Sequence, residues 1–325
     1  MKLNKLVMPV IILSILIFTG CDSDNTTNTP DETLVEYLVE NNLDLPDMLD
    51  GWIITASAVN SSFDDYYIID TRSQGDYDIG HIPGAVWADA STILDVASNS
   101  GGKIIVVHCY KGIGATRLLI ALRLSGYEDA KSLKFGASSW HADFDSWSGA
   151  VGDVATSYPN GWVTSGDPTP AVDYAYPQIA TEEVGSAAAL LAERVDILLT
   201  DGYAYANATD VLADPSSFFV NNYWPQTAWD DYGHISGAYR ISTLSLEDGG
   251  INNMDPDVPV INYCWTSQTS GMITAYLTVL GYEAQSLIKG ANGMIWSQLT
   301  SHKWDTFSGN GIPGENAPGD YTIEN

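Results

Sequence analysis

The sequence predicts an α/β protein built from two similar units, each a mainly parallel sheet with helices on both faces. Two observations predict this class. Short apolar runs rich in β-branched residues alternate with segments of helical pattern, as in parallel sheets covered on both sides. The same order of motifs also occurs twice, with Cys109 and Cys264 at matching positions 155 residues apart. A chain of 325 residues is long enough for two domains with ordinary cores.

The elements follow from local patterns. Strands are expected where β-branched apolar runs are bounded by turn residues, and helices where apolar residues recur at helical spacing. Each main helix is expected to end at a Gly-Tyr-Glu sequence, because glycine favours the end of a helix. In chain order we expect a leading helix over 32–41, strands over 66–70 and 103–108, a helix over 115–124, strands over 131–134, 195–201 and 258–263, a helix over 271–280 and a strand over 284–288.

The two cysteines are the candidate reactive groups. Each one ends a buried strand, opens a loop of small and polar residues, and precedes a helix. Sites in such sheets form at the carboxyl ends of the strands. Backbone N–H groups of the loop and the positive end of the helix favour an anion there, and the thiolate is the nucleophilic form of cysteine. The alternative is a buried structural cysteine, but the repeated placement favours chemistry.

The start of the chain resembles a bacterial lipoprotein signal. Lys2 and Lys5 precede an apolar stretch at 6–18, and the residues before Cys21 resemble a lipobox. The resemblance implies a signal peptide over 1–20, lipidation of Cys21, and a location in the cell envelope, anchored to the periplasmic or extracellular face of a bacterial membrane. An uncleaved membrane anchor is the alternative, although the stretch is short for a spanning helix. Residues 21–45 then form a lipidated tether and the leading helix.

Composition excludes several partners. The formal net charge is −28, so nucleic acid and anionic lipid are poor partners, and the membrane is expected to be reached only through the lipid anchor. Acidic clusters such as 64–65 and 230–231 lack EF-hand spacing, and we expect no metal and no cofactor. With Cys21 lipidated, Cys109 and Cys264 remain as two free thiols. A loop-like stretch at 151–176 is expected to link the units, and 307–325 to form a tail along the surface.

One set of motifs resembles a known family. The sequence Asp70-Thr-Arg72, then Gly-His-Ile-Pro-Gly-Ala at 80–85, then the strand-end Cys109 with its glycine-containing loop, resembles the rhodanese family. Matching motifs around Cys264 make the chain similar to a tandem rhodanese. The resemblance covers about 52–147 and 177–304, and it implies domains over 46–150 and 177–306. Members of this family hold sulfane sulfur as a cysteine persulfide and pass it to an acceptor.

The resemblance implies a thiosulfate sulfurtransferase. Sulfur from small anions such as thiosulfate or polysulfide would pass through a cysteine persulfide to cyanide or to a thiol or protein acceptor. Cys109 and Cys264 take the catalytic positions, Asp70 and Arg72 match a structural pair, and His81 belongs to a turn. The substrate-binding loops are Tyr110, Lys111, Gly112, Ile113 and Gly114 in the first unit, and Trp265, Thr266, Ser267, Gln268 and Thr269 in the second. Lys111 is similar to the cation of thiosulfate-using members.

The second unit departs from the pattern. Its cysteine loop carries no charge, and the 33 positions from Asp201 to His234 exceed the 11 from Asp70 to His81. We therefore expect an aromatic-rich insertion around 218–229, either a binding wall or local core. Catalysis is expected mainly in the first unit.

Three other functions share some of these sequence features. Tyrosine phosphatases need an arginine six residues after the cysteine, but Ala115 stands there and Arg117 is expected on another face of the helix. A non-catalytic scaffold lipoprotein of a membrane-associated complex, and the handling of selenium or tellurium oxyanions, stay as alternatives.

Overall fold

The computed structural model describes residues 30–179 and 185–325. The proposed signal peptide and Cys21 lie outside this part of the chain. The first unit contains α1 (Pro30–Glu40), α2 (Leu45–Leu49), β1 (Ile53–Ile54), α3 (Ala56–Ser61), β2 (Tyr66–Asp70), α4 (Gln74–Ile79), β3 (Val86–Trp87), α5 (Ile93–Ala97), β4 (Ile104–His108), α6 (Ala115–Leu124) and β5 (Lys131–Leu133). Its five strands are parallel in the order β1-β5-β4-β2-β3.

The second unit repeats this arrangement. It contains α7 (Ala187–Asp201), β7 (Ala204–Ala206), α8 (Ala208–Ala213), β8 (Phe219–Asn222), α9 (Gln226–Tyr232), β9 (His234–Ile235), β10 (Val260–Tyr263), α10 (Gln268–Val279), β11 (Ala284–Leu287) and α11 (Ala291–Met294). Four parallel strands follow the order β7-β11-β10-β8, which matches β1-β5-β4-β2. The predicted class, two α/β units with parallel sheets and helices on both faces, is confirmed.

The predicted strand over 195–201 is wrong. These residues form the second half of helix α7. The buried side chains Leu191, Val195 and Leu198 recur at helical spacing, and the Ser186 hydroxyl caps the helix by accepting the Ala189 N–H. A short apolar run is compatible with either structure, and only the longer period decides between them.

The predicted aromatic insertion is therefore also wrong. The true counterpart of β2 is β8, and the register pairs Asn222 with Tyr263 as it pairs Asp70 with His108. The segment expected to be an insertion is β8 followed by α9, which matches α4. Trp224 and Trp229 are fully buried in the core of the second unit. Asp201 is thus unrelated to Asp70, and Asn222 takes its place.

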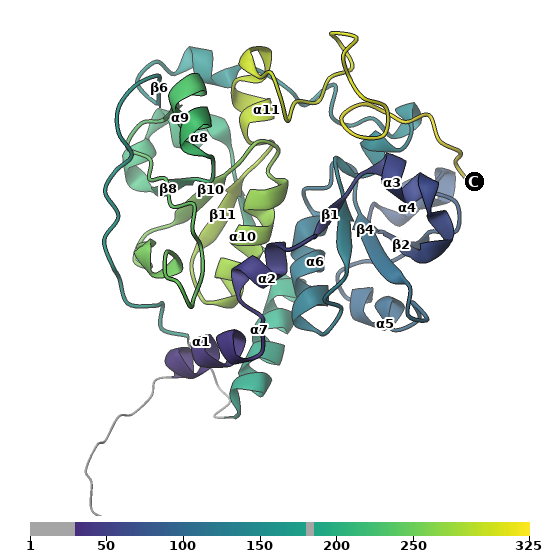
Figure 1. The fold of residues 1–325 in the computed structure, drawn as a ribbon, viewed down its shortest axis with the longest axis horizontal. Coiled ribbons are helices and arrows are strands. Elements are labelled where there is room, and N and C mark those ends of the chain that lie inside the picture. The colour runs from purple at the N-terminus through teal and green to yellow at the C-terminus, as the bar shows by residue number, and fades with distance from the viewer. Residues whose placement is uncertain (1–29, 180–184) are drawn as a thin grey trace, which may run out of the picture.

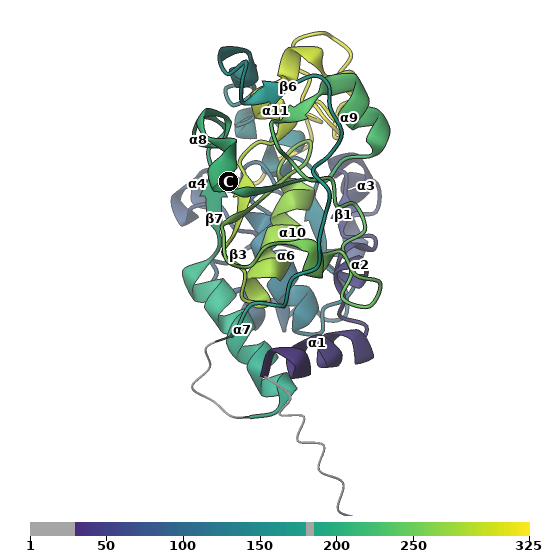
Figure 2. The same ribbon diagram turned by 90° about the vertical axis from the view of Figure 1, so that its left-hand side faces the viewer.

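The two units pack closely through the helices that follow the cysteine loops. Helices α6 and α10 lie side by side between the sheets, and α7 packs against both (Figures 1 and 2). Gly271 allows this approach, because a Cβ atom there would lie 2.4 Å from Thr116 Oγ1. One continuous apolar cluster joins the units across these helices.

Two segments outside the sheets also join the units. The linker contains β6 (Trp162–Val163), which pairs antiparallel with β9, so this part of the predicted loop is ordered against the second unit. The tail returns to the first unit, where it passes α3 and α4 (Figure 1). There Tyr321 packs edge-on against Trp140, and His81 and Glu324 exchange backbone hydrogen bonds of 2.8 and 2.9 Å.

Within the described ranges, 30–179 and 185–325, no helix has the length and apolar character needed to cross a membrane. The same part of the chain holds no cluster of three or more His, Cys, Asp or Glu side chains suited to a metal ion.

Candidate active site

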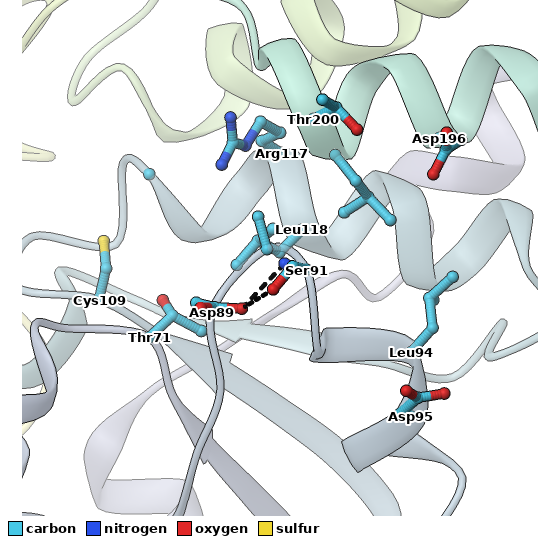
Figure 3. A pocket seen from close by; sticks show the side chains of 13 residues that line it. Thr71, Asp89, Ser91, Leu94, Asp95, Cys109, Arg117, Leu118, Asp196 and Thr200 are labelled. Atoms are coloured by element: carbon cyan, nitrogen blue, oxygen red, sulfur yellow. Dashed lines mark hydrogen bonds between the residues drawn. The ribbon is translucent and has the colours of Figure 1, made fainter.

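Cys109 directly follows β4, a central strand of the first sheet, at its carboxyl end. The residue is half-buried and has no disulfide partner among the residues that the structure describes. Its sulfur lies at one end of a cleft of about 820 Å³ between the first unit and helix α7, as Figure 3 shows. The cleft is lined by Thr71, Asp89, Ala90, Ser91, Leu94, Asp95, Cys109, Gly114, Arg117, Leu118, Asp196, Leu199 and Thr200. The thiol can therefore be reached by a small molecule.

The loop after Cys109 is held by the turn that follows β5. The Ala137 N–H donates to the Cys109 carbonyl at 2.9 Å, and the Ser138 N–H donates to the Tyr110 carbonyl at 3.1 Å. Gly112 has φ +76°, and a Cβ atom there would lie 2.8 Å from the Leu133 carbonyl oxygen. Only glycine fits this position without strain. The main chain around the sulfur is therefore fixed.

Asp70 and Arg72 form a buried ion pair behind the loop. The Arg72 guanidinium donates to both carboxylate oxygens of Asp70 and to the Gly80 carbonyl at 2.7 Å. Burial raises the pKa of Asp70, but the neighbouring His108 and the hydrogen bonds from Arg72 outweigh it, so this pKa is lowered and the carboxylate stays charged. The pair thus joins the end of β2 to the turn that contains His81.

His81 and Tyr110 both contact helix α4 or the residues next to it. The His81 ring stacks on Tyr77 at 4.0 Å, and its Nδ1 atom lies 2.9 Å from the Tyr77 carbonyl. The Tyr110 hydroxyl donates to Asp76 and accepts the Ser73 N–H at 3.0 Å. These contacts fix the turn and the start of α4. They place His81 in a structural setting, away from the residues that line the cleft.

Lys111 is half-buried in the Cys109 loop. Burial lowers the pKa of its ammonium group, the negative charge of the Cys109 thiolate raises it, and the positive charge of Lys289 from the second unit lowers it further; the net shift is downward. Its carbonyl oxygen accepts the indole N–H of Trp147 at 3.1 Å. A cation is thus held at the loop, beside a second cation from the other unit.

Cys264 has a different setting. Only 2% of the residue is exposed, and its sulfur accepts the Ser270 N–H at 3.4 Å. The next residue, Trp265, is stacked between Trp224 at 4.5 Å and His302 at 5.0 Å. The loop that should receive a substrate is therefore filled by the protein's own aromatic rings.

The polar pair behind the loop is also replaced in the second unit. Asn222 and Tyr263 stand where the first unit has Asp70 and His108, and the Asn222 amide donates to the Tyr263 hydroxyl at 2.6 Å. Trp224 stands where the first unit has Arg72. The second unit thus keeps the fold of the site but has neutral side chains at its charged positions.

Most of the predicted second loop faces inward. Thr266, Ser267 and Gln268 are buried, and Ser267 takes the left-handed conformation (φ +67°) that Gly112 has in the first unit. The Gln268 amide reaches the first unit, where its oxygen accepts the Phe135 N–H at 3.0 Å. Its Nε2 atom donates to the Leu133 carbonyl at 3.3 Å. This residue joins the two cysteine loops.

The sequence did not indicate three residues of the Cys109 site. Arg117 lies on the wall of the same cleft as Cys109, on another face of helix α6 than the buried Ala115 (Figure 3). Two residues after the alanine, the helix has turned Arg117 toward α7, and a Cβ atom on Gly202 would lie 2.1 Å from its Nη1 atom. Thr71 lines the cleft from the end of β2, and Tyr205 approaches from β7. No local sequence pattern links these residues to Cys109.

A half-exposed cysteine after a central parallel strand, a fixed loop and a cleft define a nucleophile-type cysteine site on a repeated α/β fold. Residues 55–143 match the family model described as Rhodanese-like domain. The chain therefore contains a rhodanese-like domain around Cys109, and its second unit repeats the same fold.

Solved structures with similar folds include sulfurtransferases. A thiosulfate sulfurtransferase from Pseudomonas aeruginosa is 15% identical, with 82% of this chain and 47% of that chain covered and a TM-score of 0.29. A 3-mercaptopyruvate sulfotransferase from Escherichia coli is 18% identical, with 74% and 98% covered and a TM-score of 0.28. A rhodanese-like domain protein from Staphylococcus aureus is 21% identical, with 26% and 87% covered and a TM-score of 0.23. No curated protein matches the chain.

Proposed function

We propose that this protein is a sulfurtransferase in which Cys109 carries the sulfur as a persulfide. The observation that supports this most is the setting of Cys109, a half-exposed thiol on a fixed loop at the end of a cleft, within the matched domain. The donor is a small sulfur-containing anion such as thiosulfate or polysulfide. The acceptor is cyanide, a thiol or a protein-borne thiol.

The chemistry needs no cofactor. The Cys109 thiolate attacks the outer sulfur of thiosulfate, the S–S bond of the donor breaks, and its electron pair leaves with sulfite. An acceptor then attacks the outer sulfur of the persulfide and releases the thiolate. Two half-reactions of this kind predict ping-pong kinetics.

We also propose that the protein works at a bacterial membrane, held by a lipid on Cys21. The support is the sequence of residues 1–21 alone. Mass analysis of the protein from a bacterial membrane fraction would test it, and an unmodified Cys21 amine and thiol would contradict it.

Intact-mass measurement after incubation with thiosulfate tests the transfer itself. We expect one added sulfur atom on the wild-type protein, removed by cyanide. Cys109→Ser should abolish this adduct, and Cys264→Ser should keep it. Retention of the adduct in Cys109→Ser, or a wild type that forms no adduct with thiosulfate or with polysulfide, would contradict the proposed function.

In this scheme the second unit has a structural role. Cys264 is buried and its loop is occupied by Trp265, so we propose that the unit stabilises the first site and takes no sulfur itself. A protein that forms no persulfide at all would instead be a scaffold, the main alternative.

A further inference from the structure

Gly114 leaves an open position beside the candidate nucleophile. It lines the cleft and directly precedes helix α6, with an ordinary φ of −67°. The point where a Cβ atom would lie is 3.7 Å from Cys109 Sγ and 3.7 Å from the Tyr205 hydroxyl oxygen. In the part of the chain that the structure describes, no third atom outside the chain neighbours of Gly114 lies within 4 Å of that point. The sulfur and the hydroxyl oxygen therefore both lie beside the open face of Gly114, and a group bound over this face can contact the two together.

Tyr205 is held in place by the second unit. Strand β7 pairs Tyr205 with Ser286 of β11, which fixes its main chain. The ring lies 5.1 Å from Tyr203, whose hydroxyl is 3.0 Å from Thr116 Oγ1 in the first unit. Through this contact Tyr203, which packs against Tyr205, is connected to helix α6 of the first unit. The 42% exposure of Tyr205 shows that its ring also faces open space.

The Tyr205 hydroxyl is a hydrogen-bond donor at neutral pH. Burial raises its pKa, the hydrogen bond with Tyr203 and the positive charge of Arg117 lower it, and the negative charge of the Cys109 thiolate raises it; the net shift is upward. A phenol that stays protonated can donate to an oxyanion without losing its proton. Arg117 adds positive charge on the wall of the same cleft.

We propose that Tyr205 of the second unit donates a hydrogen bond to the oxyanion end of a sulfur donor bound over Gly114, next to Cys109. The inference rests on the proposed function and identifies the donor class as one that carries oxygen anions, such as thiosulfate. When the thiolate attacks and the S–S bond breaks, negative charge develops on the departing sulfite. A fixed donor aimed at that charge lowers the barrier. The second unit thus completes the site of the first.

Two substitutions test this arrangement: one removes the hydrogen-bond donor, and the other fills the space beside Cys109. Tyr205→Phe removes only the hydroxyl. Gly114→Ala fills the open position, and the fold should tolerate it because the new methyl group makes ordinary contacts of 3.7 Å. Tyr127→Phe and Gly149→Ala are matched controls outside the cleft, the latter with no atom within 4 Å of the added methyl group.

Steady-state kinetics with two donors separates recognition from general damage. For Tyr205→Phe we expect kcat/KM for thiosulfate to fall about tenfold, as expected for a lost hydrogen bond to a charged group. An alkyl persulfide with an uncharged alkyl group should lose less than twofold. Gly114→Ala should impair thiosulfate at least as much, and both controls should stay within twofold of the wild type. Equal losses for both donors in Tyr205→Phe, or an unaffected Gly114→Ala, would overturn the proposal.

Sulfite protection provides a readout that does not depend on turnover. Sulfite should slow the alkylation of Cys109 in the wild type, and protection should weaken in Tyr205→Phe. A wild type that forms no persulfide but shows this difference would contradict the proposed function and keep the oxyanion site. A wild type that forms the persulfide but shows equal protection in both proteins would overturn only the oxyanion site.

Discussion

At the scale of single residues, the two cysteines differ by what surrounds them. Cys109 opens on a cleft with a buried ion pair behind its loop, whereas Cys264 is 2% exposed behind a stacked tryptophan. Both follow the matching central strand of their unit, so the difference arises from the residues of each loop and from how they pack. Reactivity should follow exposure, because a buried thiol is inert.

This difference predicts selective alkylation. Treatment of the folded protein with an uncharged alkylating agent near neutral pH should modify Cys109 and leave Cys264 unmodified, and both should react in denaturant. Peptide mass mapping would measure the two sites separately. Rapid labelling of Cys264 in the folded state would show that its loop opens, and would restore the second unit as a candidate for chemistry.

Lys111 predicts a donor-dependent pH effect. Because the pKa of this lysine is lowered, chiefly by burial, its charge is lost at a lower pH than that of an ordinary lysine. The kcat/KM for thiosulfate should therefore decline on the alkaline side as Lys111 becomes neutral. Lys111→Arg should move this decline to higher pH, since arginine keeps its charge.

Lys111→Ala completes the comparison. It should weaken the use of thiosulfate more than that of an alkyl persulfide with an uncharged alkyl group, and the difference should shrink as salt rises, if solvent reaches the site. Identical pH profiles for the wild type and Lys111→Arg would remove Lys111 from donor recognition.

At the scale of elements, the contact between the two cysteine loops depends on Gln268. Its buried amide bonds the turn at Phe135, a residue in the left-handed conformation (φ +61°), and that turn holds the Cys109 loop. Non-glycine residues in this conformation need support from their surroundings. The second loop therefore acts as a clamp on the first.

Gln268→Glu tests the clamp with almost no change of shape. The new carboxylate would face the Leu133 carbonyl oxygen, which now accepts a hydrogen bond. We expect a loss of about 2–3 kcal/mol in the free energy of unfolding, because a buried carboxylate would lie against a carbonyl oxygen and only the Phe135 N–H would still donate to it. Urea denaturation measures the loss, with Gln298→Glu on the surface as control. Equal stability of the two variants would exclude a clamp.

Some elements could be predicted from the sequence and others could not. Strand 66–70 and helix 115–124 were predicted with the bounds that the structure has, because turn residues flank both. The start of the second unit was misassigned, because an apolar run is compatible with a strand or a buried helix. The Cys109 loop was predicted from its motif. Arg117 and Tyr205 were not, since they approach Cys109 only through the packing of the two units.

At the scale of the whole molecule, the tail joins the end of the chain to the first unit. The Trp140 indole donates to the Thr322 carbonyl at 2.8 Å, and the Ser57 N–H donates to the Gly314 carbonyl at 3.1 Å. Tyr321 packs on Trp140. These contacts cover a tryptophan of the first core.

Removal of residues 312–325 should therefore destabilise the first unit. We expect about 3 kcal/mol less stability, since several hydrogen bonds and an aromatic contact are lost together. Trp140 fluorescence should shift to longer wavelength as water reaches the ring. Tyr321→Ala in the full chain should give a smaller change in the same direction. A truncated protein with unchanged stability and fluorescence would show that the tail only rests on the surface.

The course of the chain has a consequence for the order of biosynthesis. Domains usually fold as they emerge, the N-terminal one first. Here the residues that cover Trp140 and pair with His81, in the first unit, are made after both units. The site at Cys109 also needs Tyr205 and Gln268 from the later half. A nascent first unit therefore lacks part of its site, and the cleft at Cys109 is completed only after the second unit has been made.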